Sequence, residues 1–189
     1  MRLTESERLT LLRFARHTIA AHLARRALPP LAAAGGLDRF GGAFVTLQIE
    51  QRLRGCIGYV EADRPLVDVV QHCAISAATD DPRFPPVTPE ELDRVALEIS
   101  VLGPIEPVAD VATIVIGRHG LIVQHHHRRG LLLPQVATEW AWTRETFLAQ
   151  TCVKAGLPAN AWRHGAEVLV FEAEVFGENV SEDRSQKPE

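Results

Sequence analysis

The sequence has no long apolar run: its wholly apolar stretches are a few residues long, whereas a helix that crosses a bilayer needs ~20. Charged side chains also occur throughout the first twenty residues, where a secretory signal needs an apolar core. Both absences argue against a membrane or exported protein. We therefore expect a cytoplasmic chain that makes no contact with a membrane.

Cysteine is scarce as well. Cys56, Cys73 and Cys152 are an odd number at unrelated spacings, which favours reduced thiols over a disulfide framework. None has the paired spacing of a zinc site, and the sequence contains no glycine-rich phosphate loop, nucleophile elbow or metalloprotease signature. The sequence therefore predicts neither a metal nor a cofactor.

A large excess of one charge is also absent. The net charge of −4 and the isoelectric point near 6.1 give no overall attraction to a phosphate backbone. Three tryptophans, at positions 140, 142 and 162, together with Arg128 and Arg129, would suit base stacking. Large aromatic side chains more often fill a core or an interface, so nucleic acid is not the expected partner.

The composition that remains is globular, with 46% hydrophobic and 23% charged residues. Helices are predicted at 5–28, after Pro65 and after Thr143. Strands are predicted at 44–49, 53–60, 95–101, 114–116, 121–123 and 168–175. This order favours an α+β fold with a mixed, largely antiparallel sheet and flanking helices in one compact unit.

The domain should span residues 1–176. Residues 177–189 are polar and offer little apolar surface for docking, so we expect a disordered and dispensable tail. Cys73 and Cys152 fall on the apolar stripes of predicted helices and should be core residues.

The segment Leu53–Gly58 (Leu-Arg-Gly-Cys-Ile-Gly) contains the most distinctive residues of the chain. Because side chains alternate along a strand, Arg54, Cys56 and Gly58 should share an open face, while the intervening residues face the core. Arg54 would then lie about 7 Å from Cys56 and favour its thiolate. One hypothesis is a reactive or ligand-binding thiol. The other is a small packed residue, with Gly55 and Gly58 admitting a bulge or a close neighbour.

Histidines supply further candidate groups. Asp68, His72 and Ser76 repeat at spacing four on one helix face, which suits either a base with its orienting carboxylate or a solvated surface. His119 lies in a short connection predicted at 117–120. The run His125–His127 contains metal-binding side chains, but neighbours in an extended segment point to opposite sides, so a solvated hairpin tip is preferred.

Several segments resemble the AMMECR-type family, named for the AMME chromosomal region, whose prokaryotic members are called AmmeMemoRadiSam system protein A. The resemblance runs from about Phe44 to Val175. The matching segments are Leu53–Gly58, Asp81–Val87, Glu98–Leu102, Gly117–Leu121, Gly130–Val136 and Gln150–Leu157. The chain departs from the family most visibly at His125–His127, where similar proteins tend to have Lys, Gly or Ser.

The resemblance implies a two-subdomain α/β fold and, in prokaryotes, an association with a Memo-like protein and a radical-SAM protein. It implies no particular reaction. The favoured function is a binding or adaptor module that presents the groove of the motif to a partner or small ligand. Its candidate ligand-binding residues are Arg54, Gly55, Gly58, His72 and His119.

The alternative is an enzyme that uses Cys56 as a nucleophile or redox thiol. An active site brings several titrating groups into one pocket, and only Cys56, His72 and Arg54 are plausible members here. The sequence therefore slightly favours the binding module, with Cys56 as the one candidate catalytic residue.

Overall fold

The structure, a computed structural model, describes residues 2–178 and divides the chain into two compact units. Among the described residues, the first unit comprises 2–101 and 174–178, and the second is Leu102–Ala173. The strand pairs within both units are antiparallel, so the predicted α+β class with a largely antiparallel sheet is confirmed. No helix in the described residues is both long and apolar enough to span a bilayer.

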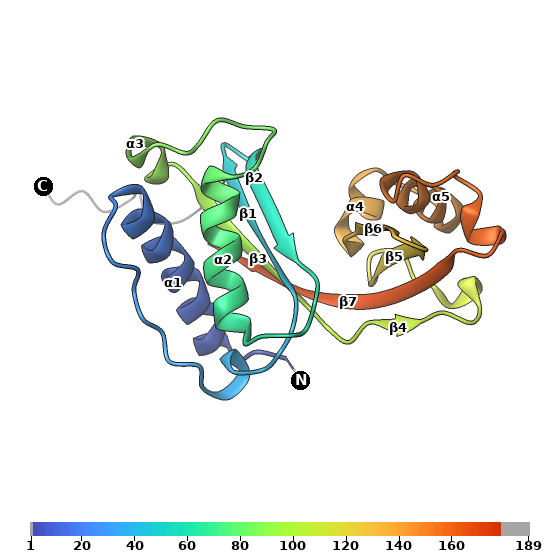
Figure 1. The fold of residues 1–189 in the computed structure, drawn as a ribbon, viewed down its shortest axis with the longest axis horizontal. Coiled ribbons are helices and arrows are strands. Elements are labelled where there is room, and N and C mark those ends of the chain that lie inside the picture. The colour runs from blue at the N-terminus through green and yellow to red at the C-terminus, as the bar shows by residue number, and fades with distance from the viewer. Residues whose placement is uncertain (1, 179–189) are drawn as a thin grey trace, which may run out of the picture. The chain divides into compact units, whose positions relative to one another are not determined.

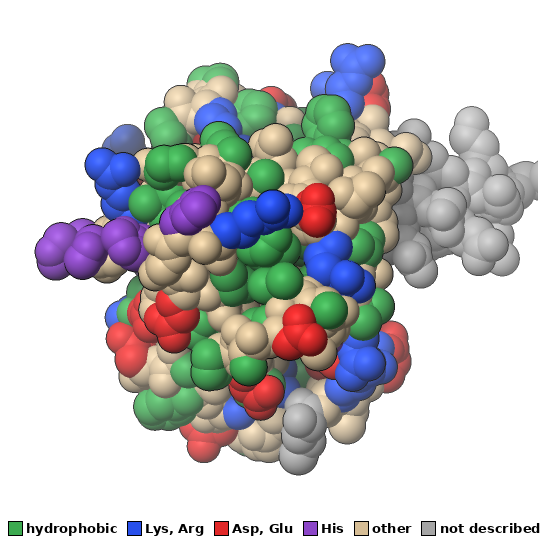
Figure 2. Space-filling view, turned by 90° about the vertical axis from the view of Figure 1, so that its right-hand side faces the viewer, with side chains coloured by type: hydrophobic (Ala, Val, Ile, Leu, Met, Phe, Trp, Pro, Cys, Tyr) green, Lys and Arg blue, Asp and Glu red, His purple; other side chains and the backbone are tan. Residues whose placement is uncertain are grey.

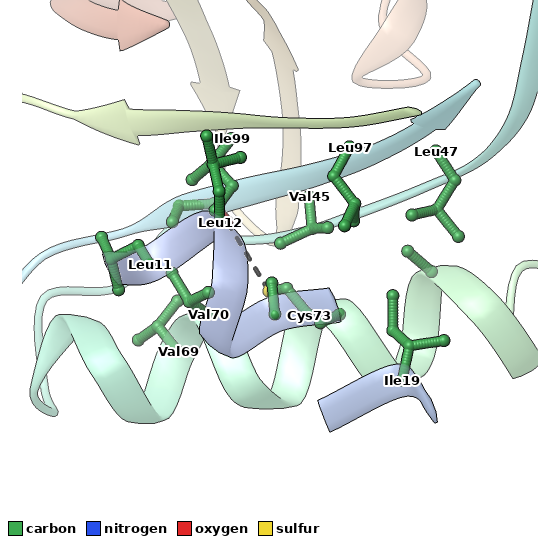
Figure 3. Close-up of a cluster of buried hydrophobic side chains, with 14 of the residues drawn as sticks. Leu11, Leu12, Ile19, Val45, Leu47, Val69, Val70, Cys73, Leu97 and Ile99 are labelled. Carbon is green, nitrogen blue, oxygen red and sulfur yellow. Dashed lines mark hydrogen bonds between the residues drawn. The ribbon is translucent and has the colours of Figure 1, made fainter. Parts of the chain in front are cut away.

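The first unit places two helices on one face of three strands (Figure 1). Strand β1 (Ala43–Ile49) lies between β2 (Arg52–Tyr59) and β3 (Ala96–Leu102). The helices are α1 (Glu5–Leu23) and α2 (Leu66–Thr79), and a short α3 (Pro89–Leu92) precedes β3. Apolar side chains of both helices meet those of the strands, as Figure 3 shows, and form a buried core. Cys73 lies in this core as predicted.

Helix α1 ends earlier than the predicted Leu28. Thr4 and Glu7 form the expected capping box at its start, but the last helical residue is Leu23. Arg25 then adopts a left-handed backbone (φ 52°), and the N–H of Arg26 bonds back to the carbonyl of Ala21. This is the hydrogen-bond pattern of a Schellman stop, which here forms without glycine.

The second unit contains β4 (Glu106–Pro107), β5 (His119–His125), β6 (Arg128–Leu132) and the first part of β7 (Glu167–Gly177). Strand β5 lies between β6 and β7, and β4 pairs with β7. Helix α5 (Arg144–Lys154) packs against β5 and β6. It begins at the predicted cap, Thr143, and carries the predicted core residue Cys152.

One prediction for this unit was wrong, and one helix was missed. Residues 114–116 are not a strand: a short 3-10 helix (Val111–Thr113) comes first, Gly117 takes a positive φ of 82°, and β5 begins only at His119. Helix α4 (Pro134–Glu139) was not predicted, because its six residues carry too few turns to show a helical period.

The histidine run forms the predicted hairpin tip. His125 pairs with Arg128, which leaves His126 and His127 as a two-residue loop, and all three histidines are exposed. In Figure 2 a group of histidine side chains stands out from the surface at one edge. Within residues 2–178, no three or more His, Cys, Asp or Glu side chains are arranged so that they could hold a metal ion.

The end of β7 belongs to the first unit and extends past the predicted boundary at Phe176. The N–H of Glu178 donates to the carbonyl of Leu97 at 2.9 Å, and its carboxylate accepts from the Leu97 N–H at 3.0 Å and from Arg16 at 2.7 Å. The boundary therefore falls at least two residues too early. The rest of the predicted tail, 179–189, lies outside the described residues.

These contacts predict a sharp difference between two truncated chains. A chain that ends at Phe176 loses the Glu178 contacts and should be less stable by about 1.5–3 kcal/mol, the usual value for hydrogen bonds to a charged group. A chain that ends at Glu178 keeps them and should melt with the full-length protein. Urea unfolding of the three chains measures the difference. Equal stability of the two truncated chains would show that Glu178 contributes nothing.

Candidate functional site

Strand β2 contains the motif and is irregular at Arg54, the second residue of the motif. Gln48 of β1 pairs with Leu53 and Leu47 pairs with Gly55, so Arg54 has no partner on β1 and forms a β-bulge. The bulge interrupts the alternation from which we expected Arg54 and Cys56 to share a face. Leu53, expected in the core, is 42% exposed.

The two glycines of the motif are in contact with different neighbours. A Cβ on Gly55 would lie 2.1 Å from the carbonyl oxygen of Ala77, so α2 packs directly on the backbone of β2. A Cβ on Gly58 would lie 2.1 Å from the ring of Phe44, which covers this glycine from the neighbouring strand. Gly55 therefore faces the helices, and Gly58 lies on the opposite face.

Arg54 binds the proline-rich loop 80–89, which follows α2 and ends on the first residue of α3, to strand β2. Its Nε and Nη2 donate to the two carboxylate oxygens of Glu91, at 3.1 and 2.9 Å. Its Nη1 and Nη2 donate to the carbonyls of Pro85 and Pro86, at 2.9 and 3.3 Å. These bonds use four of the five N–H donors of a guanidinium. Arg54 and the Thr88 backbone N–H lower the pKa of Glu91, which thus stays ionised as the anchor.

The loop is also bound to β2 through the backbone of Cys56. Its N–H donates to Asp81 Oδ2 at 2.9 Å, and its carbonyl accepts from Arg83 Nη2 at 3.2 Å. Asp81 is only 4% exposed and accepts from Arg83 Nε and Nη2 at 2.9 and 2.6 Å. The Arg83 guanidinium, with the backbone N–H groups of Cys56 and Arg83, holds the pKa of Asp81 well below its usual range. The loop is therefore tied to the strand by a charged pair.

The side chain of Cys56 lies in a row of polar residues on the face opposite α2. Thr46 pairs with Cys56 on one side and with Glu98 on the other, so the three side chains share that face. The Thr46 hydroxyl donates to Cys56 Sγ at 3.3 Å. Burial raises the pKa of the Cys56 thiol, and the Thr46 hydrogen bond and the charge of Arg83 only partly oppose this. Cys56 is therefore a protonated thiol at neutral pH.

Ser100 adds a buried hydroxyl to the same face. It pairs with Phe44, which in turn pairs with Gly58, so this second row lies beside the first. Ser100 is 1% exposed, and its Oγ has no hydrogen-bond partner among the described residues. A buried hydroxyl without a partner is uncommon, because removing it from water costs about 1–3 kcal/mol. The face thus carries hydrogen-bonding capacity that the described residues do not use.

The candidate histidines do not join this row. His72 is exposed on α2, the helix that packs against the other face of β2. His119 belongs to the second unit, where its Nδ1 accepts from the Val115 N–H at 3.2 Å.

Sequence reasoning missed four groups around Cys56. These groups are Thr46, Asp81, Arg83 and Glu98. The signal for two of them was present, because Asp81 and Arg83 both lie in a segment that resembles the AMMECR-type family. Thr46 and Glu98 could not be placed beside the motif from the sequence, because their positions depend on the register of the strands.

Comparison with known proteins places the chain in a family. It matches the AMMECR1 family over residues 12–176. It is 46% identical to a protein of Methanothermobacter thermautotrophicus, with 94% of this chain and 97% of that protein covered, and 42% identical to protein MJ0810 of Methanocaldococcus jannaschii, with 93% and 92% covered. The crystal structure of the uncharacterized protein PH0010 from Pyrococcus horikoshii superposes with a TM-score of 0.88, at 41% identity and 95% coverage of both chains. The chain therefore belongs to the AMMECR1 family.

The contacts of the motif predict a ranking of substitutions. Gly55→Ala should cost about 3 kcal/mol or more, because a backbone carbonyl must move, whereas Gly58→Ala should cost about 1 kcal/mol, because the whole Phe44 side chain can turn about χ1. Cys56→Ala should also cost about 1 kcal/mol. In a Phe44→Leu background the cost of Gly58→Ala should fall while that of Gly55→Ala stays. Denaturant unfolding measures each value, and a Gly55→Ala variant as stable as the parent would contradict the ranking.

Proposed function

We propose that this protein is a binding module whose recognition surface is the face of β2, β1 and β3 opposite the helices. The observation that carries the proposal is the buried Ser100 hydroxyl, which has no partner among the described residues and lies on the same face as Cys56 and Thr46. Because Ser100 is 1% exposed, a ligand or partner must displace the atoms that cover it, and its hydrogen bond to Ser100 would then offset the cost of burying the hydroxyl. Cys56 and Thr46 offer further weak donors and acceptors beside it.

The surroundings of Cys56 favour binding over thiol chemistry. A nucleophilic cysteine needs a lowered pKa or an adjacent base, whereas burial raises the pKa of this thiol and its hydrogen-bond partner is a threonine hydroxyl. Arg54, the expected activator, is bound to Glu91 and to two loop carbonyls. The enzyme alternative therefore keeps Cys56 but loses Arg54 and His72, the two groups expected to act with it.

We further propose that the module acts in the cytoplasm and that its partners are a Memo-like and a radical-SAM protein. The resemblance of the motif segments to prokaryotic proteins of the AmmeMemoRadiSam system supports this choice of partners. The odd number of unpaired cysteines supports a reducing compartment.

The test is a titration of the Memo-like and the radical-SAM protein of the same genome, each purified, against this chain and two variants. Ser100→Ala removes the hydroxyl of the proposed surface and should weaken binding about tenfold, equivalent to 1.4 kcal/mol. His72→Ala alters an exposed residue of α2 and should bind like the parent. If neither protein binds, the choice of partners is wrong. If one binds but both variants bind equally, the proposed surface is wrong.

A further inference from the structure

The loop 80–89 runs along the outer edge of β2. Its first part reaches the strand at Cys56 through Asp81 and Arg83, and its later part reaches Arg54 through the carbonyls of Pro85 and Pro86. The residue number rises along the loop as it falls along β2. The loop therefore lies antiparallel to the strand, in the place of a neighbouring strand.

The contacts at Cys56 reproduce one residue of a β-ladder. Strand β2 pairs with β1 on one side, and the N–H and C=O of Cys56 are bound on the other side, so they point away from β1. A neighbouring strand would accept from this N–H and donate to this C=O. Here the Asp81 carboxylate and the Arg83 guanidinium perform these roles with side chains.

The loop cannot become a strand itself. Four of its ten residues, at positions 82, 85, 86 and 89, are prolines, which have no N–H to donate. Proline and charged side chains are also the features with which proteins protect the edges of their sheets from other chains. The loop thus covers the edge of β2 without continuing the sheet.

We propose that Asp81 and Arg83 close the edge of β2 against pairing with β2 of a second copy of this chain. Two copies related by a two-fold axis at Ile57 would place Cys56 of one opposite Gly58 of the other, since both residues direct their N–H and C=O outward. Antiparallel pairing would then form about four hydrogen bonds. This inference is independent of the proposed function, because it concerns the edge of the strand and not its open face.

The test is the double variant Asp81→Ala/Arg83→Ala, which removes both charges together and leaves neither unpaired. Sedimentation over a concentration series should show an apparent mass that rises toward twice that of the parent. Hydrogen exchange should show the Gly58 amide protected at high concentration and released on dilution. Arg94→Ala is the matched control: Arg94 pairs with the exposed Glu50, and its loss should leave both measurements unchanged.

Two results would overturn the proposal. One is a folded double variant with the mass of the parent at every concentration. The other is a rise in mass while the Gly58 amide exchanges as fast as in the parent, because association would then use another surface. If circular dichroism shows that the double variant is unfolded, Asp81→Ser/Arg83→Ser, which also removes both charges but keeps short polar side chains, decides by the same two measurements.

Discussion

The buried carboxylate of Asp81 holds the motif region together. It accepts from the backbone N–H of Cys56 and from the guanidinium of Arg83, which itself reaches the Cys56 carbonyl. A buried charge is tolerated only when it is paired and hydrogen-bonded, so the loop cannot leave the strand without exposing an unsatisfied strand edge and an unpaired carboxylate. Arg54 fastens the same loop at the bulge. The environment of Cys56 therefore depends on the loop as much as on the strand.

Strand β2, which contains the motif, has a different neighbour on each of three sides. Gly55 lets α2 pack on its backbone, Arg54 and the Cys56 backbone hold the loop along its edge, and Cys56 and Gly58 face the surface opposite the helices. The helix and the loop fill two of these sides, and on the third side Thr46 and Ser100 are buried while Cys56 is half-buried. The face with Thr46, Cys56 and Ser100 is the side on which recognition is proposed.

The fold class, the capped helices and the core cysteines could be predicted because they follow from local periodicity and capping chemistry. The end of α1 was placed wrongly because a left-handed Arg25 replaces the glycine that usually marks a helix stop. Arg54 was expected to activate the Cys56 thiol but binds the loop instead, because a bulge at Arg54 breaks the alternation of side chains. The bulge depends on the register with β1 and could not be predicted from the motif alone. The surroundings of Cys56 come from residues 10 to 42 positions away, such as Thr46, Asp81 and Glu98, and only the folded chain brings them together.

Asp81, and not its neighbour Asp80, ties the loop to the motif strand. Native-state hydrogen exchange of the Cys56 amide in Asp81→Ala and Asp80→Ala tests this directly, since Asp80 is exposed and does not contact β2 through the hydrogen bonds described. Asp81→Ala should greatly accelerate exchange at Cys56 and lower the free energy of unfolding by about 1.5–3 kcal/mol, while Asp80→Ala should match the parent. Equal protection of the Cys56 amide in both variants would show that Asp81 does not hold the loop.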